Sequence, residues 1–373
     1  FSRGGDGLAA IGPVLREYLI AEAMHALGIP TTRALAAVST GANVYRETPL
    51  PGAILTRVAA SHIRVGTFQY GAARGEVDKV RALADYAILR HYPEIADAEN
   101  PYLEFFVAVT DAQAALVASW MNIGFIHGVM NTDNMTISGE TIDYGPCAFM
   151  NSYSPGTVFS SIDQHGRYAY ANQPEILVWN LARLAETLIP IVDPDKNRAI
   201  ELLTETIDCI KPLYESHWLA GMQSKIGLST EDPQDQKLIT DLLSVMAEGQ
   251  ADFTLVFRHL AKVLLGVSDP VRNLFKDPAA FDLWLQRWQK RLEQEGVSKE
   301  TRAEAMDRFN PIYIPRNHKV EEALSAAVEQ GDMKPFTKML NVLSHPFEDI
   351  QEEEVYSEPP PLSNIPYRTF CGT

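Results

Sequence analysis

The stretch HGVMNTDNMTISGETIDYG, residues 127–145, decides how the rest of the chain is interpreted. It contains His127, an Asp-Asn pair at Asp133 and Asn134, and a closing DYG that begins at Asp143. The runs MTI and TID alternate like short strands around SGE, a sequence that is typical of a tight turn. Such a hairpin brings Asn134 and Asp143 to the same end. An amide and a carboxylate oxygen suit Mg²⁺, which completes its shell with phosphates and waters.

The spacing of these residues is that of a kinase catalytic loop followed by a metal-binding turn. Kinases place a catalytic Asp two residues after the His, an Asn five residues further on, and a second Asp in a D-F-G turn. Asn134 lies seven positions after His127, but Val129 stands at the position of the base and cannot accept a proton. Asp133 is the only carboxylate nearby. The stretch therefore predicts either an inactive kinase fold or an enzyme with different chemistry, although each motif alone also fits an ordinary turn.

Composition and charge narrow the class of protein. The 373 residues, 46% hydrophobic and 21% charged, describe an ordinary globular protein with room for two or three lobes. The net charge of −16 argues against nucleic acid and anionic membranes as partners. The longest apolar run, residues 112–126, is short for a membrane span. The cysteines Cys147, Cys209 and Cys371 lie far apart without a CxxC pair, which predicts a reducing compartment, the cytoplasm, and no zinc site.

Hydrophobic periodicity predicts an α+β fold, with a small mixed α/β part followed by a large helical part, and the kinase-like loop lies between these two lobes. A helix over 11–30 precedes strands over 34–44 and 53–68, and helices follow over 76–91 and 100–124. After residue 172 the pattern is helical, over 179–191, 197–218, 234–248, 253–265 and 281–295. We expect residues 1–72 to form the remainder of a small α/β lobe and residues 73–347 a mostly helical lobe that carries the catalytic loop 127–145. Residues 348–373 are predicted to be an extended acidic, proline-containing tail.

Other charged residues fit a site for polyphosphate. Arg57 and Arg64, in LTRVAASHIRVG, can present two guanidinium groups to phosphates. Glu17, on the first helix, resembles the glutamate that pairs with the phosphate-binding lysine of kinases. Each of the three residues alone also fits a solvated surface, and the glycine-rich SRGGDG near the start lacks the full GxGxxG pattern.

Longer motifs resemble those of the selenoprotein O family: SRGGDG, LTRVAASHIRVGTFQ, HGVMNTDNM, TIDYGP, GRYAYANQPEILVWNLARLA, ADFTLVFR and NPIYIPRNH. The resemblance runs from Ser2 to the tail. It implies a kinase-like fold that transfers AMP from ATP to hydroxyl side chains of proteins, with ATP bound in an inverted orientation. The α-phosphate then takes the reactive position, so Val129 no longer implies an inactive enzyme.

The resemblance also implies a role for each site residue. Asp133 would be the general base, and Asn134 and Asp143 would hold Mg²⁺, or Mn²⁺ in its place. Asp6, Gly7, Arg57, Arg64 and Asp143 match positions that contact ATP, and Glu17 matches the glutamate that pairs with a lysine. The expected partners are ATP and proteins with accessible Ser, Thr or Tyr hydroxyls.

One departure from the family pattern leaves alternatives open. The family's glycine-rich loop and its lysine precede SRGGDG and are not in this sequence, so we expect a chain that is truncated at its amino terminus. The competing hypotheses are a kinase that transfers the γ-phosphate and a binding module without activity. Cys371 matches a position at which some family members carry selenocysteine, which indicates either a redox-responsive tail or a simple solvated thiol.

Overall fold

A computed structural model describes residues 5–361 and 367–370 of the chain. The strands are β1 (Ala9–Ala10), β2 (Arg33–Tyr45), β3 (Pro49–Val58), β4 (Phe125–Ile126) and β5 (Ala148–Phe149). The helices are α1 (Ile11–Ala26), α2 (Val65–Ala72), α3 (Val77–His91), α4 (Pro101–Asn122), α5 (Gln173–Val192), α6 (Lys196–Lys225), α7 (Asp235–Gly249), α8 (Phe253–Leu264), α9 (Asp269–Arg272), α10 (Ala279–Glu293), α11 (Lys299–Phe309), α12 (Asn317–Gln330) and α13 (Lys334–Leu343). Short 3₁₀ helices are η1 (Pro93–Ile95), η2 (Thr132–Asn134), η3 (Tyr170–Asn172) and η4 (Gln351–Tyr356).

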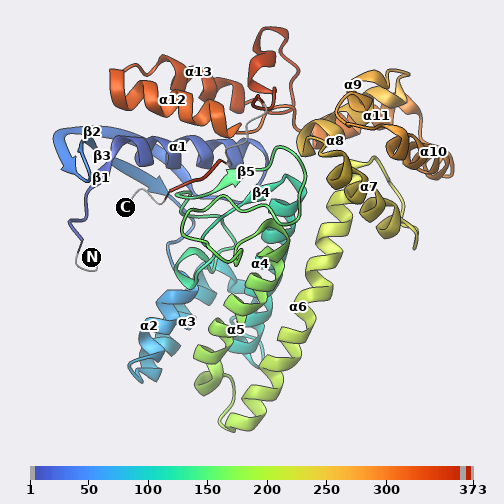
Figure 1. The fold of residues 1–373 in the computed structure, drawn as a ribbon. Coiled ribbons are helices and arrows are strands. Elements are labelled where there is room, and N and C mark those ends of the chain that lie inside the picture. Colours follow the sequence, from blue (N-terminus) through green and yellow to red (C-terminus); the bar gives the residue numbers. More distant parts are fainter. Residues whose placement is uncertain (1–4, 362–366, 371–373) are drawn as a thin grey trace.

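These elements form a small sheet-bearing part and a large helical part (Figure 1). The first sheet is antiparallel, in the order β1-β3-β2, with α1 packed against β2 and β3. The long helices α4, α5 and α6 lie side by side, and α7 to α11 gather at one end. The predicted α+β class is confirmed. The lobe boundaries near residues 72 and 347 stay a prediction.

The second predicted strand was too long. Residues 53–68 are rich in apolar and β-branched side chains, but β3 ends at Val58, and α2 begins at Val65. The intervening segment pairs with the catalytic loop instead of extending β3: the Val65 N–H donates to Met135 O at 2.9 Å, and the Ile137 N–H donates to Ile63 O at 3.0 Å. Strand propensity reports side-chain surroundings more than intrinsic backbone preference, so it could not locate this change of partner.

The predicted hairpin in the catalytic loop is wrong in its pairing, although the chain does turn there. Thr136 Oγ1 donates to Glu140 O at 2.6 Å, which closes the turn. The two arms bond outward and not to one another: the first arm pairs with residues 63–65, and Thr141 exchanges backbone hydrogen bonds with Thr32 and Pro30 at 3.0 and 2.9 Å. The catalytic loop is therefore held on both arms by segments of the sheet-bearing part.

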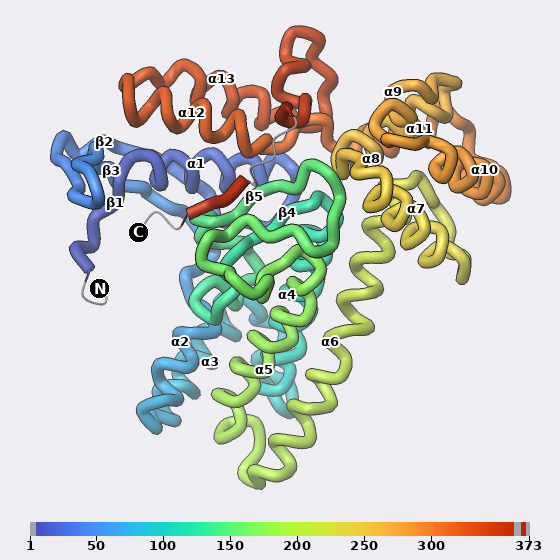
Figure 2. Tube along the Cα trace, in the orientation of Figure 1, coloured from blue at the N-terminus to red at the C-terminus, as the bar shows by residue number. Residues whose placement is uncertain are grey.

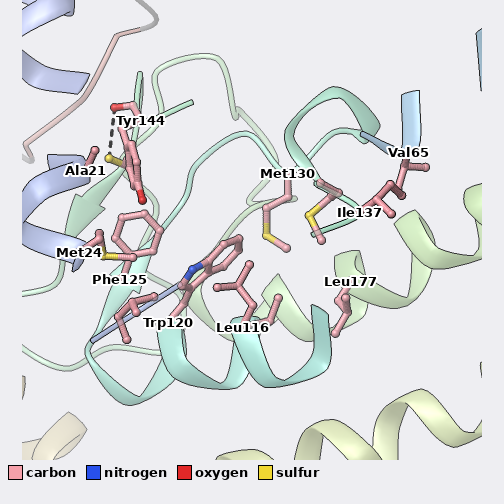
Figure 3. Packing of buried hydrophobic residues seen from close by; sticks show 14 of the residues in the cluster. Ala21, Met24, Val65, Leu116, Trp120, Phe125, Met130, Ile137, Tyr144 and Leu177 are labelled. Atoms are coloured by element: carbon pink, nitrogen blue, oxygen red, sulfur yellow. Dashed lines mark hydrogen bonds between the residues drawn. The ribbon is translucent and has the colours of Figure 1, made fainter. Parts of the chain in front are cut away.

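The main hydrophobic cluster surrounds α4. This helix is long and apolar enough to cross a membrane by length and composition alone. Phe105, Phe106, Val109 and Trp120 on it are buried, however, against α5, α6 and the catalytic loop. Figure 3 shows Trp120 beside Phe125 and Leu116, with Met130 and Ile137 of the catalytic loop over the same helix. The structure thus uses α4 as a core helix.

A second hydrophobic cluster, here called the satellite cluster, is formed mainly by α7, α8, α10 and α11. The helix predicted over 281–295 corresponds to α10, and its apolar residues lie on one face: Phe281, Trp284, Trp288 and Leu292 are buried, and Leu285 is half-buried. Trp284 and Trp288 stack with ring centroids 5.6 Å apart and planes 14° from parallel. Their indole N–H groups donate to the carbonyls of Leu238 and Ile226 at 2.8 Å, which satisfies both polar atoms inside the cluster.

The carboxyl-terminal segment is only partly extended, in contrast to the prediction. Residues 351–356 form η4, and Glu353 is buried. Figure 2 shows residues 367–370 close to β5. There Thr369 receives the Ser161 N–H on its carbonyl at 2.9 Å and donates Oγ1 to Pro146 O at 2.6 Å. Cys371 lies outside the described residues.

Candidate active site

A cavity of about 1020 Å³ lies between α1, the β2–β3 sheet and the catalytic loop. Its wall is mostly apolar along the sheet and mostly polar along the loop, and small-molecule sites combine apolar walls with a few polar groups in this way. The polar residues of the wall are Glu17, Thr40, Asn43, Arg57, Arg64, Asn131, Asp133, Asn134 and Asp143. Gly7 and Val129 belong to the same wall. Of the predicted site residues, all but Asp6 therefore meet in one cavity.

Asp143 is the centre of an ion cluster in this cavity. Arg57, on β3, donates Nη2 to Asp143 Oδ1 at 2.7 Å and to Glu17 Oε2 at 3.0 Å. Arg64 donates Nη2 to the other carboxylate oxygen of Asp143 at 3.2 Å. Burial raises the pKa of Glu17; the Arg57 charge opposes this rise, and the Asp143 charge adds to it. Two arginines and two carboxylates thus neutralise one another at the base of the cavity.

Glu17 is expected to pair with a lysine, but among the described residues its partner is an arginine. Here Glu17 on α1 pairs with an arginine of β3, and its other oxygen accepts the Tyr144 N–H. The pair ties the helix, the sheet and the DYG turn together. A guanidinium carries five N–H donors, and in the described residues Arg57 donates to the two carboxylates through Nη2 alone. Donors therefore remain for phosphate oxygens.

Asp143 also has an unusual backbone. Its φ of 63° lies in the left-handed region, which non-glycine residues rarely adopt and Asp tolerates better than most. The next residue, Tyr144, is buried in the main cluster, 6.1 Å from the Phe125 ring (Figure 3). Packing of Tyr144 on one side and the two arginines on the other hold this conformation, as is common for strained residues at functional sites.

His127 is a structural residue of the loop. It is fully buried, and its Nε2 lies 2.9 Å from Ile142 O, the residue before Asp143. Its N–H donates to Gln173 Oε1 at 3.0 Å, and its ring lies 5.4 Å from that of Trp120. Burial lowers the pKa of His127, which favours the neutral ring. The histidine thus orders the DYG turn and takes no part in the cavity wall.

Asp133 and Asn134 are presented by η2. Asn131 Oδ1 accepts the Asp133 N–H at 2.9 Å and caps this short helix. Asn134 donates Nδ2 to Val129 O at 2.8 Å, an assignment that leaves its amide oxygen as the atom for a ligand. The Asp133 carboxylate lies against Gly66 of α2. Val129, at the position of a kinase base, contributes an apolar side chain to the wall.

The donor set fits Mg²⁺ or Mn²⁺. One amide oxygen from Asn134 and the carboxylate of Asp143 share a cavity that also holds arginines for phosphate. Among the described residues no group of three or more His, Cys, Asp or Glu side chains forms a dedicated metal cage. Mg²⁺ is usually bound by one or two carboxylates together with waters and substrate phosphates, so this incomplete set is the expected one.

Asp6 lies at the edge of the cavity, outside its wall. Its carboxylate pairs with Arg46 at 2.8 Å and accepts the Leu8 N–H at 2.9 Å. Arg46 also donates to Leu8 O at 2.9 Å. Gly7, between Asp6 and Leu8 in the sequence, has a φ of 70° and lines the cavity. Asp6 and Arg46 therefore shape the segment that places Gly7, and residues 2–4 of SRGGDG lie outside the described residues.

Sequence reasoning missed several residues that order the site. Arg16, next to Glu17, is buried and donates to the carbonyls of Gly145 and Cys147 at 2.9 and 2.6 Å. The helical spacing from Arg16 to the apolar residues Leu19 and Ile20 was the available signal. Arg46 and Gly66 gave no signal, because their contacts join segments that are distant in the sequence.

Comparison with known proteins agrees with this geometry. The family described as "Protein adenylyltransferase SelO" matches residues 1–344. A protein of Rhizobium leguminosarum bv. trifolii is 58% identical over 375 residues, which cover 100% of this chain and 75% of that protein. A protein of Cereibacter sphaeroides (strain KD131) is 59% identical over 375 residues, 100% of this chain and 76% of its own length. Both bear the name "Protein nucleotidyltransferase YdiU". With the catalytic-loop residues in one cavity and relatives matched along its whole length, the chain belongs to the SelO family.

Proposed function

We propose that this chain is a protein adenylyltransferase that moves AMP from ATP, with Mg²⁺ or Mn²⁺, to Ser, Thr or Tyr hydroxyls of other proteins. The observation that best supports this proposal is a single cavity lined by Asp133, Asn134, Asp143 and two arginines. Val129 occupies the position of a kinase base in the same cavity. The names of the relatives support transfer of a nucleotidyl group to protein. The cytoplasm is the proposed location, in keeping with the unpaired thiols of Cys147 and Cys209.

In the proposed reaction, a substrate hydroxyl oxygen bonds to the α-phosphorus of ATP. The bond from the α-phosphorus to the bridging oxygen of the β-phosphate breaks, and pyrophosphate leaves with that electron pair. Asp133 accepts the hydroxyl proton. Arg57 and Arg64 offer N–H donors to the phosphates, whose negative charge is distributed over several oxygens in the transition state. A bound Mg²⁺, held by Asn134 and Asp143, would supply further charge neutralisation.

The test uses ATP labelled at either the α- or the γ-phosphate, Mg²⁺ and a mixture of acceptor proteins. Asp143→Asn is the control, because Asn tolerates the left-handed backbone at this position but lacks the charge. We expect label from the α-phosphate alone on protein, reduced at least about 100-fold in the control. The whole Rhizobium leguminosarum protein serves as the comparator.

Three other results contradict the proposal. Label from the γ-phosphate alone would identify a kinase. Label from the α-phosphate that survives Asp143→Asn would remove this cavity as its source. Label by the Rhizobium protein but not by this chain would leave a binding module as the function of this chain.

A further inference from the structure

Gly66, the second residue of α2, lies directly against the Asp133 side chain. A Cβ atom placed on Gly66 would come within 2.2 Å of Asp133 Oδ1 and 3.2 Å of its Cγ. The next atom, Thr132 O, would be 3.4 Å away, which is an ordinary separation. The Asp133 carboxylate therefore occupies the space that any side chain at position 66 would fill.

The backbone at Gly66 does not itself require glycine. Gly66 lies in a helix and is not among the described glycines with a positive φ, so an L-residue can adopt its conformation. Alanine is favoured over glycine in a helix by up to about 1 kcal/mol. Helix formation alone would therefore favour alanine here, and the need for space explains the glycine.

The same turn of α2 fixes the other catalytic-loop residues. Arg64, which precedes the helix, donates its guanidinium to Asp143 at 3.2 Å, and its N–H donates to Thr67 Oγ1 at 3.1 Å. The Val65 N–H donates to Met135 O at 2.9 Å. Contacts to Asp143, to the end of η2 and to Asp133 thus arise within three consecutive residues. This turn sets where the two aspartates stand relative to each other.

We propose that Gly66 is a positioning residue, whose missing side chain lets the Asp133 carboxylate reach its place in the cavity. The proposal rests on the proposed function, in which Asp133 accepts the hydroxyl proton. Gly66 is not part of the cavity wall, so a methyl group there displaces Asp133 and does not obstruct the nucleotide. The displacement needed to restore an ordinary contact is roughly 1 Å.

The first test compares Gly66→Ala with Gly71→Ala. Gly71 lies in the same helix, and its added Cβ would meet only Val80, with Cγ2 at 3.1 Å, away from the cavity. We expect kcat for α-phosphate transfer to fall about 10²-fold in Gly66→Ala, because a 1 Å misplacement can cost that much. KM for ATP should change less than about two-fold, and Gly71→Ala should keep both constants. Equal kcat in the two variants would overturn the proposal.

A second test works through stability and needs no activity. Gly66→Ala should lower the thermal unfolding midpoint, or leave it unchanged, while Asp133 is present. In the Asp133→Ala background the clash is absent, and the same change should raise the midpoint by roughly 1–3 °C through helix propensity. Identical shifts in both backgrounds would mean that Gly66 does not act through Asp133. If the unsubstituted chain transfers no AMP, the proposed function fails, and the midpoints still decide whether Gly66 seats Asp133.

Discussion

Replacement of Arg57 by methionine should destabilise the protein by a predictable amount. The change keeps an apolar stem but removes the Nη2 atom that donates to Glu17 at 3.0 Å and Asp143 at 2.7 Å. Hydrogen bonds to charged groups contribute about 1.5–3 kcal/mol each, so the gross loss is about 3–6 kcal/mol. Solvent screens part of this interaction energy, because the side chains are partly exposed: 20% for Arg57, 17% for Glu17 and 34% for Asp143. We expect the free energy of unfolding to fall by about 2–3 kcal/mol.

The loss of stability in Arg57→Met should also depend on pH. The pKa of Glu17 is raised by burial, with Asp143 adding to the rise and Arg57 opposing it. When an acid has a higher pKa in the folded state, that state binds more protons, and stability falls as the pH rises above the usual value of 4.5. Without Arg57 the Glu17 pKa rises further. The destabilisation of Arg57→Met should therefore be smaller near about pH 5 than near about pH 8.

The assay is urea unfolding at both pH values. The variants are Arg57→Met, Glu17→Gln, the double variant and Arg33→Met as a matched control. Arg33 pairs with Glu22 across the same sheet and helix, but it is 42% exposed, so its loss should stay below about 1 kcal/mol. The double variant should recover part of the stability, because it removes the carboxylate left without its partner. The reasoning is refuted if Arg57→Met is as mild as Arg33→Met, or equally costly in the Glu17→Gln background.

Three further predictions concern other parts of the chain. The Glu295 side chain is 1% exposed; burial raises its pKa, but hydrogen bonds from Arg302, Thr230 and Ser229 outweigh this and lower the pKa to about 2. The Glu295 carboxylate stabilises the fold fully above its usual pKa of 4.5, and this stabilisation is lost as the pH falls toward 2. Between these pH values the free energy of unfolding should fall by about 3 kcal/mol less in Glu295→Gln than in the unsubstituted protein, as measured by unfolding titrations. Burial raises the pKa of the Cys147 thiol to about 12, whereas Cys209 is exposed. Alkylation of the native protein, followed by peptide mass spectrometry, should label Cys209 and spare Cys147 until denaturant is added, and early labelling of Cys147 would contradict its burial. Arg46→Ala should weaken ATP binding several-fold in calorimetry without a change in the unfolding midpoint, because Arg46 orders residues 6–8 from an exposed position; an unchanged Kd would contradict that role.

Periodicity and spacing in the sequence predicted much of this molecule. The helices over 76–91, 100–124 and 253–265 match α3, α4 and α8 closely, because each has an apolar face against a core. The spacing from His127 to Asn134 and Asp143 located the cavity, since those residues come from one continuous stretch. Local patterns carry such information because the partners lie within a few turns of chain.

The features that the sequence did not predict depend on distant partners. The alternation in residues 135–143 signals extended backbone, but it does not say that the partners are residues 30–32 and 63–65. Gly66 resembles any helix glycine until Asp133 is placed beside it. Arg57 resembles a surface residue of a strand until α1 brings Glu17 to it. In each case the chemistry arises from a tertiary contact that no local propensity encodes.

The stacked pair Trp284–Trp288 gives one end of the molecule its own optical signal. Two stacked indoles with centroids 5.6 Å apart couple their electronic transitions, and circular dichroism detects a skewed pair as a couplet that isolated tryptophans lack. Trp120, in contrast, sits 5.4 Å from His127 in the main cluster, close to the catalytic loop. The couplet therefore follows the melting of the satellite helices separately from that of the main cluster around Trp120.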